Sequence, residues 1–204
     1  MQRISDIFPI VAILNILLMN PQLAAAQNAD SVKTALVLVD IQYFYFPGSK
    51  GALVNPESAS ANAALVLKRF RESGQLVVHV RHNAKMLAEI YPDVAPLDNE
   101  KVITKNYANS FRDTDLLDFL QKNGIKRLII CGMMTHMCVE ATTRAAADLG
   151  FQCVVIADAC TTRDLKYEDK VIPAEQVHYS TLSTIAYAYG KVMDTKNFLD
   201  TFRF

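Results

Sequence analysis

The chain lacks tryptophan, has only seven glycines and four cysteines among 204 residues, and carries no net charge. Because the charge is balanced and no basic run breaks that balance, nothing attracts phosphate backbones or anionic lipids, which argues against nucleic acid and membrane surfaces as partners. Four cysteines without Cys-x-x-Cys or Cys/His spacing exclude a disulfide-built scaffold and disfavour structural zinc. Gly48, Gly51 and Gly132 fit neither the Rossmann nor the P-loop spacing, which disfavours nucleotide binding.

Hydrophobic residues make up 51% of the chain and charged residues 21%, a composition that excludes disorder as a description of the whole. The length suits one medium-sized globular domain with a single core. No shift in composition marks a second domain, so we expect a single domain over residues 27–204.

The first 26 residues differ from the rest of the chain. Arg3 precedes an apolar stretch over residues 7–19, and small residues at 24–26 precede Gln27. This layout predicts a signal peptide over residues 1–26, cleaved after Ala26, and a processed protein that is periplasmic or secreted without membrane contact. A short membrane anchor and a buried N-terminal helix are the alternatives, although the apolar run is shorter than the roughly 20 residues that span a bilayer.

Strand and helix patterns alternate along the remaining chain. Four apolar runs have the composition of strands buried on both faces of a parallel sheet, and they are 35–39, 76–80, 128–131 and 153–157. Helical patterns are found over 55–73, 115–123, 139–149 and 174–189, and weaker strand patterns over 102–104 and 191–193. This alternation predicts an α/β fold of three layers, with helices on both faces of a mostly parallel, Rossmann-like sheet of six strands.

Ligands of such sheets bind outside the carboxyl ends of the strands. That rule selects Asp40 after the first strand, Lys105 after the weak strand at 102–104, the connection over 132–138, and Asp158, which we expect to close the strand at 153–157. Asp40 alone could simply end a strand by capping a turn, and Lys105 alone could be a solvated lysine. If they stand at adjacent strand ends, the carboxylate and the ammonium would hold each other ionised in a crevice.

Cys138 is expected at the start of the helix over 139–149. The positive end of that helix and its unpaired N–H groups would lower the pKa of the thiol and favour the thiolate. Cys138 is therefore a candidate nucleophile, with a neighbouring backbone amide to stabilise an oxyanion. The alternative is that it is a small hydrophobic residue of the core, as most free cysteines are.

Four segments occur in a specific order, and they are LVDIQ at 38–42, Lys105 leading into Ser110 and Phe111, GMMTHMCVEAT at 132–142, and ADAC at 157–160. Together they resemble the successive motifs of the isochorismatase-like cysteine hydrolases over nearly all of residues 27–204. The resemblance implies a catalytic triad of Asp40 as base, Lys105 as its cation and Cys138 as nucleophile. It also implies a cis peptide bond between Met133 and Met134, and an oxyanion hole formed by the N–H groups of Met134 and Cys138.

The resemblance implies a cysteine hydrolase, an amidohydrolase that cleaves the C–N bond of a small amide or ureido compound through a thioester, and the predicted signal peptide makes it an exported enzyme. Hydrolysis of an isochorismate-like vinyl ether is the alternative reaction, and a non-catalytic binding or thiol-sensing protein is the alternative class. The family also commonly forms homo-oligomers, dimers or tetramers. Apolar surface for such contacts is expected over 167–171 and around Ile185, Ala186, Tyr187 and Tyr189.

The expected substrate pocket contains no metal and no cofactor. Nicotinamidases of the superfamily bind a metal through histidines after the second strand, whereas His79 and His82 here would point to opposite faces of a strand and cannot chelate together. Aromatic side chains at such spacing are more often core residues than pocket residues. The residues that could line the pocket are Gln42, Phe44, Phe46, Tyr107, Phe111 and His136. Cys131 and Cys153 should be core residues, while Cys160 could form a disulfide with Cys138 at the shared sheet edge.

Overall fold

The computed structural model describes residues 32–204, so the predicted signal peptide and its cleavage site lie outside the described residues. A central sheet of six parallel strands has the order β3-β2-β1-β4-β5-β8. Its strands are β1 (Thr34–Val39), β2 (Leu76–His82), β3 (Lys101–Lys105), β4 (Arg127–Met133), β5 (Gln152–Thr161) and β8 (Lys191–Met193). The predicted fold class is confirmed.

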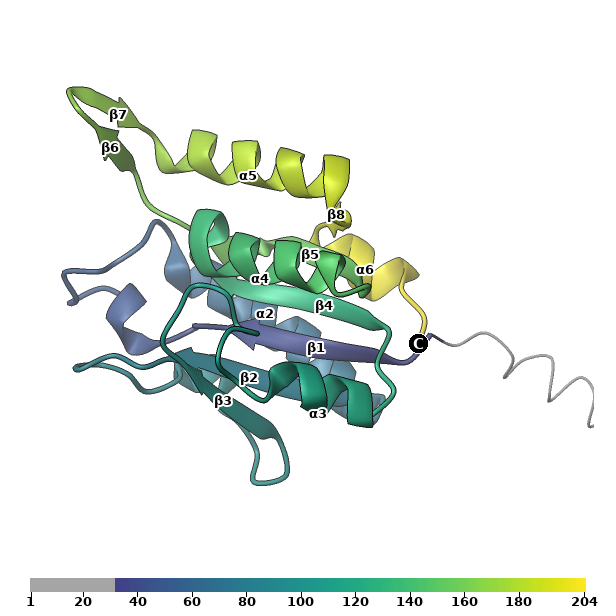
Figure 1. The fold of residues 1–204 in the computed structure, drawn as a ribbon. Coiled ribbons are helices and arrows are strands. Elements are labelled where there is room, and N and C mark those ends of the chain that lie inside the picture. The colour runs from purple at the N-terminus through teal and green to yellow at the C-terminus, as the bar shows by residue number, and fades with distance from the viewer. Residues whose placement is uncertain (1–31) are drawn as a thin grey trace, which may run out of the picture. The chain divides into compact units, whose positions relative to one another are not determined.

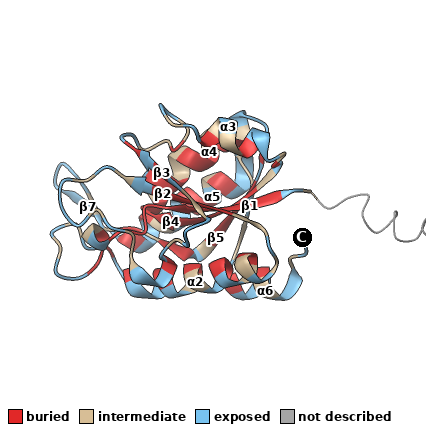
Figure 2. Ribbon diagram, turned by 90° about the horizontal axis from the view of Figure 1, so that it is seen from below, coloured by how far each residue is buried: buried red, intermediate tan, exposed pale blue. Residues whose placement is uncertain are grey.

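Helices cover both faces of the sheet, as Figures 1 and 2 show from two directions. One face carries α2 (Pro56–Glu72) and α6 (Thr195–Thr201), and the other carries α3 (Leu116–Lys122), α4 (Glu140–Asp148) and α5 (Ala174–Ala188). Side chains of a strand alternate between faces. In β1, Leu36 and Leu38 accordingly pack under α2, whereas Val37 and Val39 belong to the opposite core.

The glycines that follow α2, α3 and α4 have left-handed backbone conformations, as the sequence predicts for helix C-termini. Gly74, Gly124 and Gly150 have φ angles of 61°, 70° and 88°. Such angles are strained for residues with a Cβ atom and are readily adopted by glycine. These caps turn the chain from each helix into the next strand.

Four features of the fold differ from the expectations. Helix α6 and the hairpin of β6 (Leu165–Tyr167) and β7 (Lys170–Ile172) were not predicted, because most of their residues are exposed and the segments show no clear alternation of apolar and polar residues. The prediction that Asp158 closes a strand is wrong, since β5 continues to Thr161 beyond an irregularity in its pairing with β4. The expectation of surface at Ile185 is also wrong, since this residue of α5 is fully buried and packs into the core.

The outer surface of α5 and of the hairpin nevertheless exposes aromatic side chains. Tyr187 is 93% exposed, and Tyr167 and Val171 are also exposed. Oligomerisation through this surface stays a prediction. Within residues 32–204, no helix has both the length and the apolar character needed to cross a bilayer.

A buried ionic cluster joins α2, β2 and the connection that leads into β3. The Glu100 carboxylate accepts hydrogen bonds from Arg71 Nε at 2.8 Å, from Arg71 Nη2 at 2.7 Å and from the Leu97 N–H at 2.9 Å. His79 Nε2 lies 2.8 Å from the same carboxylate, while His79 Nδ1 is buried without a partner among the described residues. This cluster ties the loop before β3 to the sheet.

The cluster is built for an ionised glutamate and a neutral histidine. Burial alone would raise the pKa of Glu100, but hydrogen bonds from Arg71, the Leu97 N–H and His79 lower it to about 2. Burial lowers the pKa of His79. A neutral His79 donates from Nε2 to Glu100 and carries its bare lone pair on Nδ1, which accounts for the atom without a partner.

We predict that Glu100→Gln lowers the free energy of unfolding by about 2–4 kcal/mol at pH 7, because Arg71 loses its buried anion. Since the pKa of Glu100 is lower in the folded chain than its ordinary 4.5, its stabilisation is complete above pH 4.5 and is lost as the pH falls toward 2. Urea denaturation at several pH values should show the difference between wild type and variant shrinking below pH 4.5. Glu72→Gln, which alters an exposed pair with Lys68, is the control with little expected effect.

Candidate active site

A lysine and an aspartate with no solvent exposure meet at the carboxyl edge of the sheet. Asp40 follows β1 and has a left-handed backbone conformation, with φ of 51°, while its N–H donates to the Val80 carbonyl oxygen at 2.9 Å. Lys105 is the last residue of β3, and its Nζ donates to Asp40 Oδ2 at 2.6 Å. Both side chains are 0% exposed, so the reading of Lys105 as a solvated lysine is excluded.

The two residues are not on adjacent strands, as the sequence suggested. Strand β2 lies between β1 and β3, and Lys105 is in register with His82 of β2. The ion pair still forms because the lysine stem is long enough to reach past the end of β2. Lys105 Nζ also donates to the Tyr107 carbonyl oxygen at 3.0 Å and lies 3.5 Å from His82 Nδ1.

Cys138 lies in a five-residue π-helical turn, Thr135–Val139, which connects β4 to α4. The chain enters this turn through Gly132, whose φ is 140° and where a Cβ atom would lie 2.0 Å from the Val39 carbonyl oxygen. Only glycine allows β4 to approach β1 so closely at this point. The cis peptide bond implied by the resemblance is present between Met133 and Met134.

Two backbone hydrogen bonds close this turn onto a single acceptor. The N–H groups of Met137 and Val139 both donate to the Met134 carbonyl oxygen, at 3.0 Å and 3.2 Å. Cys138 lies in the first turn, where N–H groups have no partner in a preceding turn. An oxyanion hole formed by Met134 and Cys138 stays a prediction that this geometry permits.

The expectation of a Cys138 thiolate is wrong for the resting site. Burial and the neighbouring Asp40 carboxylate raise the pKa of Cys138 to about 12, against a smaller lowering by Lys105. Burial also raises the pKa of Asp40, although Lys105 lowers it. Asp40 Oδ1 is buried and has no hydrogen-bond partner among the described residues. The site therefore holds a protonated thiol beside a carboxylate oxygen that is free to accept a proton.

The three predicted pocket residues after β1 have mainly structural contacts. Gln42 is fully buried, and its amide bonds the backbone of His82 and Ala88, which fixes the chain after β2. Phe46 is buried and stacks on Tyr91 with ring centroids 3.5 Å apart. Phe44 is partly buried against the core under α2. Their contact with a substrate remains untested.

The other three follow β3 or lie beside Cys138 in the sequence. Tyr107 is 38% exposed, and the Arg112 guanidinium lies 3.6 Å from the centre of its ring. Phe111 is partly buried against the core formed with α3 and α4. His136 Nδ1 lies 2.6 Å from Thr162 Oγ1, which joins the nucleophile turn to the end of β5.

Two residues near Cys138 were missed by the sequence analysis. Burial and the charges of Cys138 and Asp40 raise the pKa of Tyr45, whereas the charge of Arg163 lowers it. Arg163 Nε donates to Met134 Sδ at 3.2 Å. Nothing in a single sequence marks Tyr45 within the run of aromatic residues at 43–46, and Arg163 lies beyond the last recognised motif.

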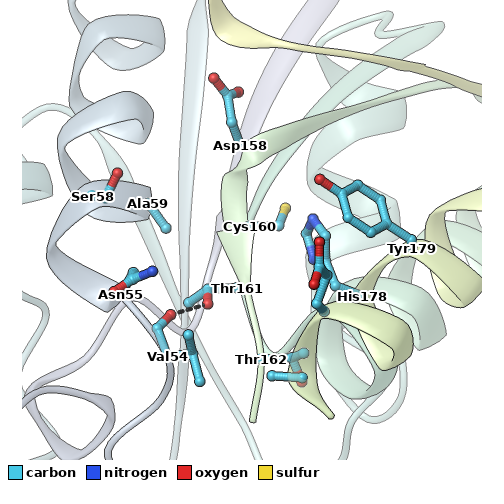
Figure 3. Close-up of a pocket in the computed structure, with 12 residues that line it drawn as sticks. Val54, Asn55, Ser58, Ala59, Asp158, Cys160, Thr161, Thr162, His178 and Tyr179 are labelled. Carbon is cyan, nitrogen blue, oxygen red and sulfur yellow. Dashed lines mark hydrogen bonds between the residues drawn. The ribbon is translucent and has the colours of Figure 1, made fainter.

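A cavity of about 210 Å³ opens beside the end of β5, next to this site. Figure 3 shows it between the N-terminal ends of α2 and α5, with Cys160, His178 and Asp158 on its walls. The Asp158 carboxylate bonds the N–H and the hydroxyl of Thr195, both at 2.8 Å, and thereby fixes the start of α6. None of Asp40, Lys105 and Cys138 lines this cavity.

Within residues 32–204, no three His, Cys, Asp or Glu side chains converge in a way that could hold a metal ion. The four histidines have separate neighbours, which are Glu100 for His79, Lys105 for His82, Thr162 for His136 and Thr135 for His178. Catalysis without a metal stays a prediction. The four cysteines are free thiols, and Cys131 and Cys153 are core residues as expected.

Comparisons with known proteins agree on one family. The family profile described as Isochorismatase domain matches residues 34–196. The isochorismatase family protein YddQ of Bacillus subtilis is 46% identical over 178 residues, covering 81% of this chain and 98% of that protein. The secreted isochorismatase effector Isc1 of Verticillium dahliae is 33% identical, covering 85% and 93%. The crystal structure of an isochorismatase from Pseudomonas putida has a TM-score of 0.78 at 34% identity, covering 85% and 96%.

We predict that Lys105→Met costs about 3–5 kcal/mol of unfolding free energy, because it leaves the Asp40 carboxylate buried and unpaired. The double variant Asp40→Asn/Lys105→Met removes both charges and should be clearly more stable than Lys105→Met alone. Equilibrium urea denaturation of the three proteins measures this. A double variant no more stable than Lys105→Met would contradict the ion pair as the source of the loss.

Proposed function

The chain belongs to the isochorismatase family of hydrolases, and on that premise we propose that it cleaves the C–N bond of a small amide or ureido compound through a thioester on Cys138. The single observation that carries the proposal is the pair formed by the Cys138 thiol and the unpartnered Asp40 Oδ1. A protonated thiol needs a base at the moment of attack, and a buried carboxylate with a raised pKa is a stronger base than one in water.

In the acylation step, Asp40 Oδ1 takes the thiol proton as Cys138 Sγ attacks the substrate carbonyl carbon. An S–C bond forms, the carbonyl π electrons move to oxygen, and the N–H groups of Met134 and Cys138 stabilise the oxyanion. Lys105 holds the other carboxylate oxygen and so keeps Oδ1 directed at the thiol. When the oxyanion collapses, the C–N bond breaks and the leaving nitrogen receives the proton from Asp40, which releases ammonia or an amine.

In the deacylation step, the regenerated Asp40 carboxylate takes a proton from water as the water oxygen attacks the thioester carbon. Collapse of the second oxyanion breaks the S–C bond, and the proton held by Asp40 returns to the sulfur. The products are an acid and the free thiol. One carboxylate thus transfers the proton in both halves of the reaction.

One relative named a hydrolase and one named an amidohydrolase support this choice of reaction. Streptothricin hydrolase of Streptomyces noursei is 33% identical over 142 residues. The match covers 64% of this chain and 50% of that enzyme. The ureidoacrylate amidohydrolase RutB of Acinetobacter baylyi is 27% identical over 184 residues. Vinyl-ether hydrolysis does not need a cysteine nucleophile, so the placement of Cys138 beside a base favours amide chemistry.

The proposal includes export, because residues 1–26 have the layout of a signal peptide. The relative from Verticillium dahliae is named a secreted effector. The processed protein would act in the periplasm or outside the cell, as a dimer or tetramer without a nucleic-acid partner.

Asp40→Asn should fold and should abolish acylation of Cys138, because the variant keeps the shape of the side chain but cannot take the thiol proton. We expect turnover to fall at least 1,000-fold, on the order of what removal of a catalytic base costs. The measurement is ammonia release from a panel of primary amides and ureido acids, with mass spectrometry of the trapped acyl-enzyme. Asp118→Asn, an exposed change of the same charge on α3, is the control. Near wild-type turnover by Asp40→Asn would overturn the triad.

Activity should survive exhaustive chelation, since the proposed chemistry uses only side chains and backbone N–H groups. Elemental analysis of active enzyme should find far less than one transition metal ion per chain. Nicotinamide should be a poor substrate, because no metal would hold its ring nitrogen. Stoichiometric metal whose removal stops turnover would restore nicotinamidase chemistry as the best explanation.

Protein recovered from its native host should begin near Gln27, because cleavage after Ala26 fits the small residues at 24–26. N-terminal sequencing of protein from separated cell fractions measures this. A cytosolic species that retains Met1 would remove the proposal of export.

A further inference from the structure

Two hydrogen bonds between a histidine and a threonine tie the nucleophile turn to its neighbours. Thr135 Oγ1, at the first residue of the turn, lies 2.9 Å from His178 Nδ1 of α5. His136 Nδ1, at the next residue, lies 2.6 Å from Thr162 Oγ1, just after β5. The turn is therefore fixed to α5 by one bond and to the chain after β5 by the other.

The backbone of the turn is held less firmly than that of an ordinary helix. Its two closing N–H groups, those of Met137 and Val139, share the Met134 carbonyl oxygen. In an α-helix each N–H group has an acceptor of its own. Single π-helical turns are rare, and they are often found at functional sites. Contacts from outside the turn must therefore help to fix the direction of the thiol of Cys138, its fourth residue.

The hydrogen bond to α5 reaches a side chain that water cannot replace. Thr135 is 0% exposed, and His178 is the partner of its hydroxyl in the folded chain. A buried hydroxyl that loses its partner stays unsatisfied or moves to find another one, and both outcomes are costly. Because Thr135 directly follows Met134, the acceptor of the turn, a movement there also displaces Cys138.

The histidine acts on the turn as a neutral group. Burial lowers the pKa of His178 from its ordinary 6.5, so the ring is mainly uncharged at pH 7. A neutral ring does not attract a thiolate as a cation would. Any influence of His178 on Cys138 therefore acts through the position of the turn and not through charge.

We propose that His178 is a positioning residue: by holding Thr135, it keeps the Cys138 thiol directed at the catalytic carboxylate. The target of the thiol is Asp40 Oδ1, the oxygen that takes its proton in the proposed reaction. This inference rests on the proposed function and adds to it a residue that acts through another. The bond from the chain after β5 fixes the next residue of the turn, so the turn is held at two successive residues.

The cavity beside the turn leaves room for substitutions that test the proposal. His178 and Thr162 both line it, as Figure 3 shows. With about 210 Å³ of space beside these side chains, a residue of another shape fits without overpacking. Substitution of His178 therefore reports the loss of a hydrogen bond and not a forced displacement of α5.

A double-mutant cycle on Thr135 and His178 tests the proposal in turnover, measured as ammonia release from primary amides and ureido acids. Thr135→Val and His178→Leu remove the same hydrogen bond, so each should lower kcat about 10- to 100-fold, the effect of misplacing a reacting group by about 1 Å. KM should change less than about 3-fold, because neither side chain is proposed to bind substrate. The double variant should be no slower than the slower single variant. Unchanged kcat in both single variants, or additive losses in the double variant, would contradict the proposal.

Conservative variants distinguish this hydrogen bond from general packing. Thr135→Ser keeps the hydroxyl, and His178→Asn keeps a polar atom near the position of Nδ1, so both should retain kcat within about 5-fold of wild type. Thr184→Val is the control, since it removes a hydroxyl that bonds only the Ser180 carbonyl oxygen within α5. It should leave kcat within about 2-fold of wild type. A loss in Thr184→Val equal to that in Thr135→Val, or no rescue by either conservative variant, would overturn the positioning role.

Alkylation of Cys138 separates failure of this inference from failure of the proposed function. Iodoacetamide modifies the thiol without any substrate, and peptide mass spectrometry assigns the modified cysteine. Because Asp40 assists loss of the thiol proton, Thr135→Val and His178→Leu should each react about 10-fold more slowly than wild type. Unchanged or faster alkylation in both variants would overturn the positioning role, and turnover by wild type would then still support the hydrolase. Slower alkylation in both variants without turnover by any of the proteins would refute the hydrolase and keep the positioning role.

Discussion

The ion pair between Lys105 and Asp40 joins two strands that are not neighbours, and it has no water to solvate it. Burying two charges is costly unless they meet each other and their remaining atoms find partners. Lys105 satisfies this requirement, because its Nζ donates to Asp40 and to the Tyr107 carbonyl oxygen and lies 3.5 Å from His82 Nδ1. Asp40 does not, because its second oxygen is left without a partner among the described residues. That unpaired oxygen of Asp40 is the group at this sheet edge that can still accept a proton.

The elements around the ion pair show how it is held in place. Gln42 fixes the chain after β2, and the Glu100 cluster fixes the loop that leads into β3. Gly132 lets β4 approach β1, which brings the turn that carries Cys138 next to Asp40. Ser110 and Thr142, whose hydroxyl oxygens are 2.7 Å apart, join the segment after β3 to α4. Each of these contacts connects segments that are distant in the sequence.

The sequence was sufficient for the sheet, because long apolar runs and glycine caps are local signals. It was also sufficient to bring Asp40, Lys105 and the turn of Cys138 to one edge, because parallel strands all end there. It failed where the answer depended on three-dimensional surroundings. The protonation state of Cys138 depends on burial, the strand order places β2 between Asp40 and Lys105, and Tyr45 and Arg163 reach the site from segments that carry no motif. The short hairpin of β6 and β7 gives no periodic pattern at all.

The exposed hairpin of β6 and β7 has a consequence for how the protein can change over evolutionary time. Asp40, Lys105 and Cys138 lie on buried segments, where a substitution disturbs the core as well as the chemistry. The segment from Asp164 through β7 is largely exposed, and the two strands of the hairpin pair only with each other. Substitutions, insertions and deletions there cost little folding free energy. A lineage with this architecture can therefore change this exposed segment at little cost to the fold, while the buried segments that carry Asp40, Lys105 and Cys138 are held by the core.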